Sequence, residues 1–546
     1  MSWNQVYDPL GNWILSTALA ALPIAVLLGT LAFLRLKAHW SAILGLLSAL
    51  IIGIFVFGMP AGKGIAVVAL GAAYGLFPIG WIILNVIFLY NLANDKGYFK
   101  ILQESLTAIT QDRRLQLLLI AFSFGAFFEG AAGFGTPVAV TAAILIGLGF
   151  SPLAASGLSL IANTAPVAYG AMGTPIIALA AVTGINIQSL SAMVGRQLPF
   201  FSIIIPFWLV WAFAGFSGML EVWPALLVAG IFFGLPQFLI SNFHGPWLAG
   251  IGAAIISIFA LTIFLLLWHP RRIWGLQGHE EGRASRGSHS YSRGEVIKAW
   301  TPWVILSILV FVWGIPQVKS FLDSLSIIRI PVPGVDKLIN RVPPVVPQPT
   351  PEGAVFSFNW LTFTGTGIFV AAIFSGFVMG LRPKEIVSAW WRTLKRVRFS
   401  LLTVAAMMAI GYTTRYSGLD ATMGLTFAKT GVLYPFFGTM LGWLGVALTG
   451  SDTSSNVLFG SLQKISAGQI GVSPVLMASA NSSGGVMGKM IDAQSIVVAS
   501  TATKWYGHEG DILRYVFFHS LVLAALVGIL VFLQAYVFPF TKMVVK

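Results

Sequence analysis

Long apolar runs follow one another along most of the chain and are separated by short polar stretches. A run of about 20 apolar residues can cross a bilayer as a helix. Two segments, 115–150 and 433–470, are apolar but broken by Gly and polar clusters, and we expect each to be a re-entrant hairpin. The pattern predicts an all-α polytopic membrane protein with two re-entrant hairpins and about 12 transmembrane helices. We expect these helices near 12–34, 40–59, 64–93, 152–184, 198–217, 222–241, 246–269, 299–318, 359–380, 399–416, 473–503 and 514–540.

Composition agrees with this class. Of 546 residues, 57% are hydrophobic and 9% are charged, whereas about 25% are charged in soluble domains. The chain has no cysteine, which excludes disulfides and thiolate metal sites. The net charge of +14 indicates cytoplasmic loops that face anionic lipid rather than nucleic-acid binding. The first apolar run starts at Trp13 without a basic segment or cleavage site before it, so we expect a retained helix.

The positions of Lys and Arg predict the orientation. Four basic stretches fall on one side of the predicted crossings, which the positive-inside rule makes cytoplasmic: Arg35 with Lys37, Lys96 to Arg114, Arg271 to Lys298, and Arg382 to Arg398. Both termini then lie outside the cytoplasm. We expect 270–298 to be a flexible cytoplasmic link, and 331–351, with seven prolines, to be an extended external loop. Basic faces on 97–111 and 383–397 favour interfacial helices.

A weak internal repeat divides the chain. Five short motifs of the first copy have counterparts in the second, each 315 to 322 residues further along the chain. Among them, the hairpin from Gly125 to Thr136 matches Gly445 to Asn456, and Ser151-Pro152 matches Ser473-Pro474. The first helices of the two copies are expected to run in opposite directions, so the repeats are inverted. The predicted units are N-terminal helices (1–63), a first repeat (64–217), linking and scaffold helices (218–398) and a second repeat (399–540).

Glu129 stands in the first hairpin among glycines, in the stretch Glu-Gly-Ala-Ala-Gly-Phe-Gly. An ionisable side chain at membrane depth is costly and usually has a function, and burial favours the neutral form of a carboxyl. We therefore predict Glu129 as a proton carrier, with Gly130 and Gly133 at the substrate. The alternative is a structural carboxylate paired with a Lys or Arg.

The second hairpin carries the polar stretch Thr449-Gly-Ser-Asp-Thr-Ser-Ser-Asn456. Hydroxyls, an amide and backbone N–H groups at a helix start could hold a small carboxylate, or could simply cap the helix. Asp452 is a second candidate proton-coupling group, with a helix cap as the alternative. The predicted substrate-binding residues here are Ser451, Thr453, Ser454, Ser455 and Asn456.

The two expected broken helices add further polar side chains at the same depth. The first supplies Asn163, Thr164 and Tyr169, and the second supplies Asn481, Ser482 and Lys489. Lys489 could neutralise a substrate carboxylate or one of the two acidic side chains, or it could extend to an interface. Tyr169 could only pack, with its hydroxyl bonded elsewhere.

Other functional classes lack their signatures. The sequence has no Gly-x-x-x-x-Gly-Lys-Ser/Thr motif to bind ATP for a transport motor and no His-Glu-x-x-His zinc motif. We therefore expect no enzyme activity, no cofactor and no metal. A channel would show flux without saturation, and a Na⁺-coupled carboxylate transporter is the closest alternative because unwound carbonyls could hold Na⁺.

The motifs resemble the L-lactate permease family over essentially the whole chain. The resemblance is carried by 129–135, by Asn-Thr-Ala-Pro-Val-Ala at 163–168, Gly-Arg-Gln-Leu-Pro at 195–199, Gly-Ser-Asp-Thr-Ser-Ser-Asn at 450–456, and by 7–12, 331–337, 416–419 and 488–491. It implies a multi-pass symporter of a bacterial or archaeal plasma membrane that takes up L-lactate, D-lactate or glycolate with protons. Transporters of similar architecture often dimerise, so a homodimer is possible by analogy.

From this resemblance and the residues above we expect lactate's carboxylate to bind at Thr453, Ser454, Ser455 and Asn456, with Asn163 and Thr164 opposite, and Glu129 to carry the proton. The sequence leaves open the preferred 2-hydroxy acid, the stoichiometry, and which of Glu129 and Asp452 titrates.

Overall fold

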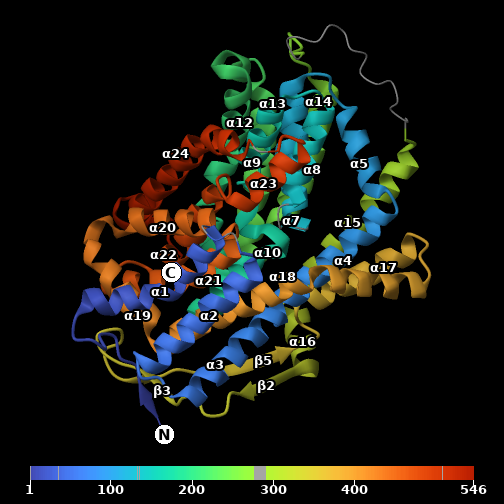
Figure 1. Ribbon diagram of the computed structural model, residues 1–546. Helices are drawn as coiled ribbons and strands as arrows, with labels where there is room; N and C mark the ends of the chain where they lie inside the picture. Colours follow the sequence, from blue (N-terminus) through green and yellow to red (C-terminus); the bar gives the residue numbers. More distant parts are fainter. Residues whose placement is uncertain are drawn as a thin grey trace.

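The computed structural model describes residues 2–32, 34, 36–131, 133, 136–275, 291–506 and 508–545. Ala132, Phe134 and Gly135 of the first hairpin motif lie outside the described residues, as do positions 276–290 of the expected link. The structure is predominantly helical (Figure 1). In the described part, nine helices are long and apolar enough to cross a membrane, or ten if one bent pair counts as a span. A helix or broken helix lies at each expected crossing, which confirms the polytopic all-α class.

The first half of the chain contains the N-terminal helices and the first hairpin. In chain order the elements are α1 (Trp13–Ala32), α2 (Ala38–Phe55), α3 (Ala61–Tyr74), η1 (Gly75–Gly80), α4 (Trp81–Asp95), α5 (Tyr98–Thr107), α6 (Arg113–Leu117), η2 (Leu118–Phe124), α7 (Gly125–Ala131), α8 (Thr136–Gly147), α9 (Pro152–Ala162), η3 (Val167–Tyr169), α10 (Gly170–Thr183), α11 (Ile187–Val194) and α12 (Leu198–Leu220).

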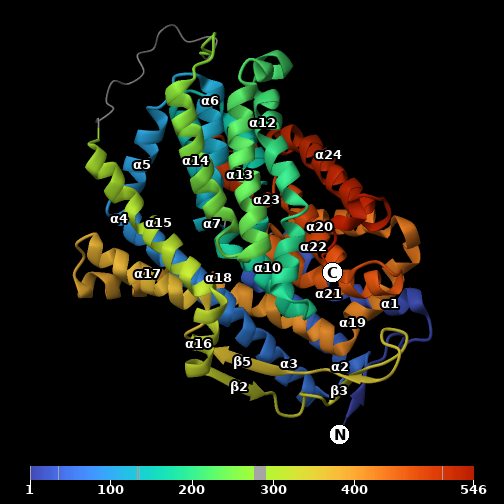
Figure 2. The same cartoon turned by 180° about the vertical axis from the view of Figure 1, so that it is seen from behind.

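The second half repeats this order after a group of linking helices. Its elements are α13 (Trp223–Phe243), α14 (Ala249–Leu267), α15 (Arg293–Gly314), α16 (Pro316–Ser326), α17 (Thr364–Val378), α18 (Pro383–Ser417), α19 (Leu419–Phe427), η4 (Ala428–Leu433), α20 (Tyr434–Thr449), α21 (Asp452–Gln469), α22 (Pro474–Gly488), α23 (Ala493–Ala502), α24 (Glu509–Tyr536) and η5 (Phe540–Met543). Seen from behind, α12, α13 and α14 stand side by side (Figure 2).

The scaffold pairs one long helix from each half of the chain. The path α3–η1–α4 packs along α18, and a Cβ at Gly71 would lie 2.6 Å from the Cα of Ala409, while one at Gly75 would lie 2.6 Å from that of Ala405. Because contacts that advance along one helix recede along the other, the two helices are antiparallel. This is the relationship expected of inverted repeats.

The long α18 corrects one sequence-based expectation. We expected 383–397 to form a separate interfacial helix before a crossing at 399–416, but Pro383–Ser417 is one continuous helix of 35 residues. No Gly or Pro occurs between Lys384 and Ser400 to end the helix, so the basic face and the apolar span are parts of a single element.

Both broken helices begin in the same way. Ser151 caps α9 by accepting a hydrogen bond from the N–H of Ala154 at 3.3 Å, and Ser473 caps α22 through that of Leu476 at 3.4 Å, with Pro at the next position in each case. The first of these helices bends by 62° between Ala162 and Val167. The second is interrupted between α22 and α23, where Lys489 and Asp492 lie.

Within the described residues, five short strands lie at one end of the molecule. β2 (Ile327–Pro331) pairs antiparallel with β5 (Val355–Asn359), and β3 (Ile339–Arg341) lies between β1 (Trp3–Asn4) and β4 (Thr350–Pro351). The expected loop 331–351 is thus partly strand, and it holds the N-terminus. We call this end the strand pole (Figure 1).

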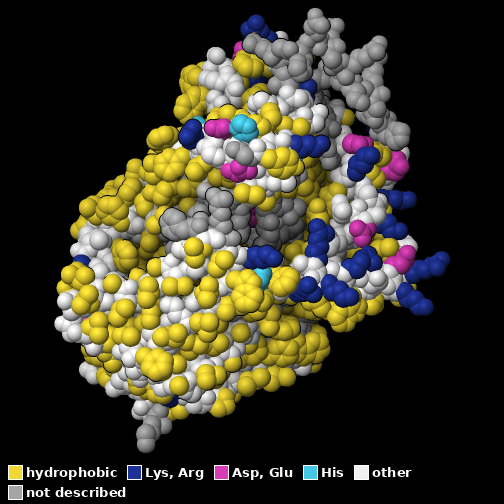
Figure 3. Space-filling view, in the orientation of Figure 1, with side chains coloured by type: hydrophobic (Ala, Val, Ile, Leu, Met, Phe, Trp, Pro, Cys, Tyr) yellow, Lys and Arg dark blue, Asp and Glu magenta, His cyan; other side chains and the backbone are white. Residues whose placement is uncertain are grey.

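Exposed Lys and Arg side chains gather in another region, which we call the basic pole. They come from α5, the start of α15 and the first half of α18, among them Lys100, Arg293, Lys384, Arg392, Lys395 and Arg396. Figure 3 shows a group of Lys and Arg side chains on the right of the view, while much of the remaining surface is hydrophobic. A wide apolar surface of this kind suits contact with lipid.

Candidate substrate and coupling site

Four ionisable or amide side chains from both repeats meet in the interior. Glu129 comes from α7, Asn163 from the end of α9, Asp452 from the start of α21 and Lys489 from the break after α22. All four are buried, with exposed fractions of 5%, 2%, 3% and 7%. The charge of Lys489 acts on both carboxyl groups, and Asn163 adjoins Glu129. We call these four residues the central cluster.

The Glu129 carboxyl is packed against backbone and has an oxygen to spare. A Cβ at Gly170 would collide with Oε1, and one at Gly133 would lie 3.6 Å from it. The other oxygen, Oε2, is buried without a hydrogen-bond partner among the described residues. A buried, unpartnered carboxyl oxygen is costly, which is typical of a group that binds something else during function.

The backbone beside Glu129 is strained. Ala171 and Met172 have φ values of 42° and 58°, followed by Gly173 at 79°. Such left-handed conformations cost non-glycine residues of order 1–3 kcal/mol and tend to occur at functional sites. A Cβ at Gly133, which itself has φ 60°, would lie 3.2 Å from the Cβ of Ala171. The strained turn therefore contacts the first hairpin at Gly133, between α7 and α8.

Asp452 has a similar setting in the second repeat. Its Oδ2 accepts a hydrogen bond from Ser482 Oγ at 2.6 Å and a longer one from Asn456 Nδ2 at 3.5 Å. Its Oδ1 lacks a partner in the described part of the chain, and a Cβ at Gly485 would collide with that oxygen. Each acidic side chain is thus backed by a glycine of the broken helix in its own repeat.

Lys489, in the break between α22 and α23, contacts the second hairpin. Its Nζ donates to the carbonyl oxygen of Gly450 at 2.6 Å and lies 3.2 Å from Oδ2 of Asp492. Asp492 also caps α23 by accepting a hydrogen bond from the N–H of Ser495 at 2.7 Å. Since an ammonium has three donors, one remains for a bound anion.

Asn163 is the neutral member of the central cluster, and its amide has unused hydrogen-bonding capacity. Both Nδ2 and Oδ1 are buried, and neither forms a hydrogen bond of good geometry with a described residue, although the amide lies beside the Glu129 carboxyl group. The neighbouring Thr164 is satisfied, because its hydroxyl donates to the carbonyl of Ile161 at 2.8 Å. Asn163 can therefore offer a donor and an acceptor to a ligand, whereas the Thr164 hydroxyl has already used its one donor and can only accept.

Several predicted substrate residues bond to one another instead. Asn481 Nδ2 donates to Asn456 Oδ1 at 3.0 Å and to Ser455 Oγ at 3.3 Å, and its Oδ1 accepts from Gln463 at 3.1 Å. Ser455 also donates to the carbonyl of Gly442 at 3.1 Å. This network joins α20, α21 and α22 and leaves its side chains little capacity for substrate.

The start of α21 is more open. Ser451 caps the helix through the N–H of Ser454, while the hydroxyls of Thr453 and Ser454 form no hydrogen bond within the described residues. These three residues line a cleft of about 20 Å³ against Met407 and Met408 of α18 and Ile83 of α4. A cleft of this size holds about one water molecule.

Two predicted site residues serve helix packing in this structure. A Cβ at Gly130 would lie 2.6 Å from the backbone nitrogen of Ile251, so Gly130 lets α7 approach α14. The Tyr169 hydroxyl donates to the carbonyl of Ser191 at 2.8 Å. Two residues at the cluster were not predicted, namely Gly170 and Gly485. They lie 315 residues apart, the lower limit of the repeat spacing, and that spacing is the signal that could have identified them.

The chemistry of the cluster suits an anion and protons better than a metal. In the described residues, no three His, Asp or Glu side chains come close enough to hold a metal ion. Instead, the central cluster combines a cation, an amide and two carboxyl groups, and its Lys489 and Asp452 lie at the start of α21. Such a helix end favours negative charge.

Comparison with known proteins identifies the family of this chain. The family model described as L-lactate permease matches residues 16–538. The chain is 46% identical to the glycolate permease GlcA of Escherichia coli (strain K12) and 46% identical to the L-lactate permease of Bacillus subtilis (strain 168). Each alignment covers 98% of this chain and 99% of the relative.

A third relative, the L-lactate permease of Escherichia coli (strain K12), is 45% identical, with 98% of both chains covered. Among solved structures, Neisseria gonorrhoeae MtrF, from a class described as antimetabolite efflux pumps, is 12% identical over 93% of this chain and 96% of its own, with a TM-score of 0.48. The match of the family model and the three permeases show that this multi-pass membrane protein belongs to the L-lactate permease family.

Proposed function

We propose that this chain is a secondary transporter that takes up L-lactate and related 2-hydroxy monocarboxylates, including D-lactate and glycolate, together with protons. Relatives at 45–46% identity are named L-lactate and glycolate permeases, which supports the substrate class. The observation that carries the coupling is the central cluster itself. It combines a buried cation, which pairs with Asp492, and two further carboxyl groups that each have an oxygen without a hydrogen-bond partner among the described residues.

The substrate carboxylate binds at the start of α21. Lys489 bonds to Gly450, which precedes the cap residue Ser451, so its ammonium lies beside the helix N-terminus. The positive end of the helix and the Lys489 charge attract the same anion. Thr453 and Ser454 add hydroxyls, and the free amide of Asn163 takes the 2-hydroxyl group of the substrate.

Protons are carried by the two carboxyl groups. An incoming anion adds negative charge next to Glu129 and Asp452, which favours protonation of one of them. Substrate binding and proton binding then support each other by linkage, and release of either promotes release of the other. Because Ser482 holds Asp452 at 2.6 Å, whereas Oε2 of Glu129 has no hydrogen-bond partner among the described residues, we assign the mobile proton to Glu129.

The geometry suits alternating access. The two repeats run in opposite directions, and their hairpins and broken helices meet at the central cluster. We assign the basic pole to the cytoplasm and the strand pole to the outside, following the distribution of Lys and Arg. Movement of one repeat relative to the other would expose the cluster to each side in turn.

The test is uptake of labelled L-lactate into proteoliposomes with an imposed inward proton gradient, with and without Na⁺. We expect saturable accumulation that needs the proton gradient, does not change when choline replaces Na⁺, and is competed by glycolate. Accumulation that requires Na⁺ would replace proton coupling with Na⁺ coupling. Flux that neither saturates nor exceeds equilibrium would make the protein a channel and overturn the proposal.

A further inference from the structure

A second cavity lies at the strand pole, away from the central cluster. It has a volume of about 580 Å³, within the range of about 300–1,000 Å³ that small-molecule sites show. Its walls come from the loop between β3 and β4 and from the last turns of α21. We call it the vestibule. Its lining residues are Arg341, Pro343, Pro344, Val345, Val346, Pro347, Lys464, Ile465, Gly468, Gln469 and Pro474.

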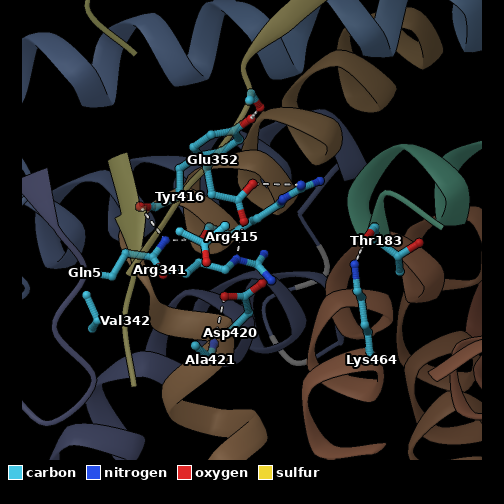
Figure 4. Close-up of polar contacts among 12 residues, drawn as sticks. Gln5, Thr183, Arg341, Val342, Glu352, Arg415, Tyr416, Asp420, Ala421 and Lys464 are labelled. Carbon is cyan, nitrogen blue, oxygen red and sulfur yellow. Dashed lines mark hydrogen bonds and ion pairs between the residues drawn. The ribbon is translucent and has the colours of Figure 1, made fainter. Parts of the chain in front are cut away.

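The charged residues that line the vestibule, Arg341 and Lys464, are both cations. Two carboxylates lie nearby, but neither forms part of the wall: Glu352 pairs with Arg341 and with Arg415, and Asp420 lies below them (Figure 4). Together the group has three cations and two carboxylates, an excess of one positive charge. A cavity lined by one sign of charge concentrates ligands of the opposite sign.

The cations retain donors for a ligand. Lys464 Nζ donates to the carbonyl of Thr183 at 2.6 Å, which uses one of its three protons. Within the described chain, the two terminal nitrogens of Arg341 have no hydrogen bond or ion pair, because its pairing with Glu352 is made through Nε. A role in capping the C-terminal end of α10 accounts for one N–H donor of Lys464. It does not account for the second cation, Arg341, on the opposite wall of the vestibule.

The vestibule lies at the end of a helix interface that leads to the central cluster. α10 and α21 pack against each other, and a Cβ at Gly460 would lie 2.6 Å from Cδ1 of Leu179. At the inner end of this interface, Asn456 Nδ2 donates to the carbonyl of Pro175 at 3.2 Å, and at the outer end Lys464 reaches Thr183. From Asp452 to Lys464 the helix rises about 18 Å.

We propose that the vestibule is a binding site for small carboxylate anions, where Arg341 and Lys464 hold the substrate before it reaches the central cluster. The identity of the anion rests on the proposed function, but the site does not, since its charge and volume would attract small carboxylates in any case. In this role the two cations raise the local concentration of substrate at the strand pole. These two cations promote capture of the substrate, whereas the central cluster carries out its translocation.

The first experiment compares Lys464→Met with the control Arg329→Met in proteoliposomes. Arg329 is an exposed cation of β2 at the same pole, but it does not line the vestibule. We expect Lys464→Met to raise the KM for L-lactate severalfold at low ionic strength with little change in maximal rate, and the difference to shrink at high salt. Lys464→Arg and Arg329→Met should retain the wild-type KM.

An unchanged KM at low salt in Lys464→Met would overturn the proposal. So would a fall in maximal rate at unchanged KM, because that result would mean that Lys464 acts only by holding Thr183. If wild-type protein in the same vesicles takes up no lactate, the proposed function fails and this experiment does not apply. A second measurement is therefore needed that does not depend on transport.

The absence of cysteine allows such a measurement. In Val346→Cys, a thiol lines the vestibule while all its charges remain, and Thr350→Cys places a thiol at the start of β4, just after the same loop and outside the vestibule. We expect a membrane-impermeant anionic thiol reagent to label the Val346→Cys variant faster than a cationic one does, and L-lactate to slow this labelling severalfold. Adding Lys464→Met to this variant should weaken both effects, since only Arg341 remains, and Thr350→Cys should show neither. Equal labelling rates without protection by lactate would refute the site.

Discussion

Gly170 and Glu129 are in direct contact: a Cβ at position 170 would collide with Oε1 of the carboxyl group. The first break thus sets the position of the acidic side chain in the first hairpin. Gly170→Ala should displace the carboxyl, and a shift of about 1 Å at a functional group can cost about 100-fold in rate. We expect lactate uptake to fall at least tenfold while the protein still folds.

The control is Gly147→Ala, because no atom lies within 4 Å of a Cβ at that position. Glu129→Asp combined with Gly170→Ala should recover part of the activity, since the shorter side chain removes the collision. Full activity of Gly170→Ala in a transport assay would show that this contact does not position Glu129.

The roles of the two carboxyl groups of the central cluster, Glu129 and Asp452, can be distinguished by the mode of transport that each variant retains. Glu129→Gln should lose accumulation driven by a proton gradient but retain exchange of labelled for unlabelled lactate, because exchange needs no net proton movement. Asp452→Asn should impair both, since it disturbs the bond from Ser482 at 2.6 Å.

The matched control is Asp95→Asn, at an exposed carboxylate that pairs with Arg392. Such a surface pair contributes about 0–1 kcal/mol, so both activities should remain. Gradient-driven accumulation by Glu129→Gln at the wild-type level would remove Glu129 from the proton path.

Lys489 should be needed for both folding and binding, and a double variant can distinguish the two roles. Lys489→Met leaves Asp492 buried without its ion pair, and breaking a buried pair costs about 3–5 kcal/mol. The double variant Lys489→Met with Asp492→Asn should recover much of the thermal stability, because no uncompensated charge remains at that pair. It should still bind lactate at least tenfold more weakly by isothermal titration, whereas wild-type affinity would show that Lys489 is only structural.

The sequence was enough to locate the helix breaks and the ionisable side chains that the structure brings together. Apolar runs interrupted by glycine mark the hairpins, and an acidic or basic residue in such a run is rare enough to be informative, as for Glu129 and Lys489. The Ser-Pro pairs at 151–152 and 473–474 also identify the start of each broken helix.

The partners of neutral polar residues could not be read in this way. Asn456 and Asn163 have the same side chain, yet the first is held by Asn481 and the second has no partner among the described residues. That difference depends on how closely α21 and α22 pack, which no local pattern encodes. The left-handed turn at Ala171 and Met172 escaped prediction for the same reason, because alanine and methionine favour helices.

Glu352 predicts an acid-sensitive contact at the strand pole. Burial alone would raise the pKa of its carboxyl, but Arg415 and Arg341 outweigh burial and hold that pKa below its ordinary value of 4.5. A carboxyl with a lowered pKa stabilises the fold above its unfolded pKa, and the contribution is lost as pH falls from about 4.5 through the folded value. The wild-type melting temperature should therefore drop in this range.

Glu352→Gln should lower the melting temperature at pH 7, because two guanidinium groups lose their shared partner at a cost of about 3 kcal/mol. Below pH 4.5 its melting curve should approach that of the wild type. Thermal unfolding in detergent between pH 3 and 7 tests this, and parallel curves for the two proteins would show that Glu352 does not contribute.

Asn163 should decide whether the transporter recognises the 2-hydroxyl group of its substrate. Its two amide atoms are buried without a hydrogen bond of good geometry to a described residue, so Asn163→Ala breaks no well-formed internal hydrogen bond and should fold normally. A site built to bond a hydroxyl rejects an analogue that lacks it, because the site's own polar atoms are then left unpaired. Wild-type uptake of lactate should thus be inhibited weakly by propionate, and Asn163→Ala should lose affinity for lactate and bind the two acids about equally.

The matched control is Thr164→Val. The Thr164 hydroxyl bonds only to the carbonyl of Ile161, so its loss should leave the ratio of lactate to propionate affinity unchanged. Retained discrimination in Asn163→Ala would place recognition of the hydroxyl elsewhere, at Thr453 or Ser454.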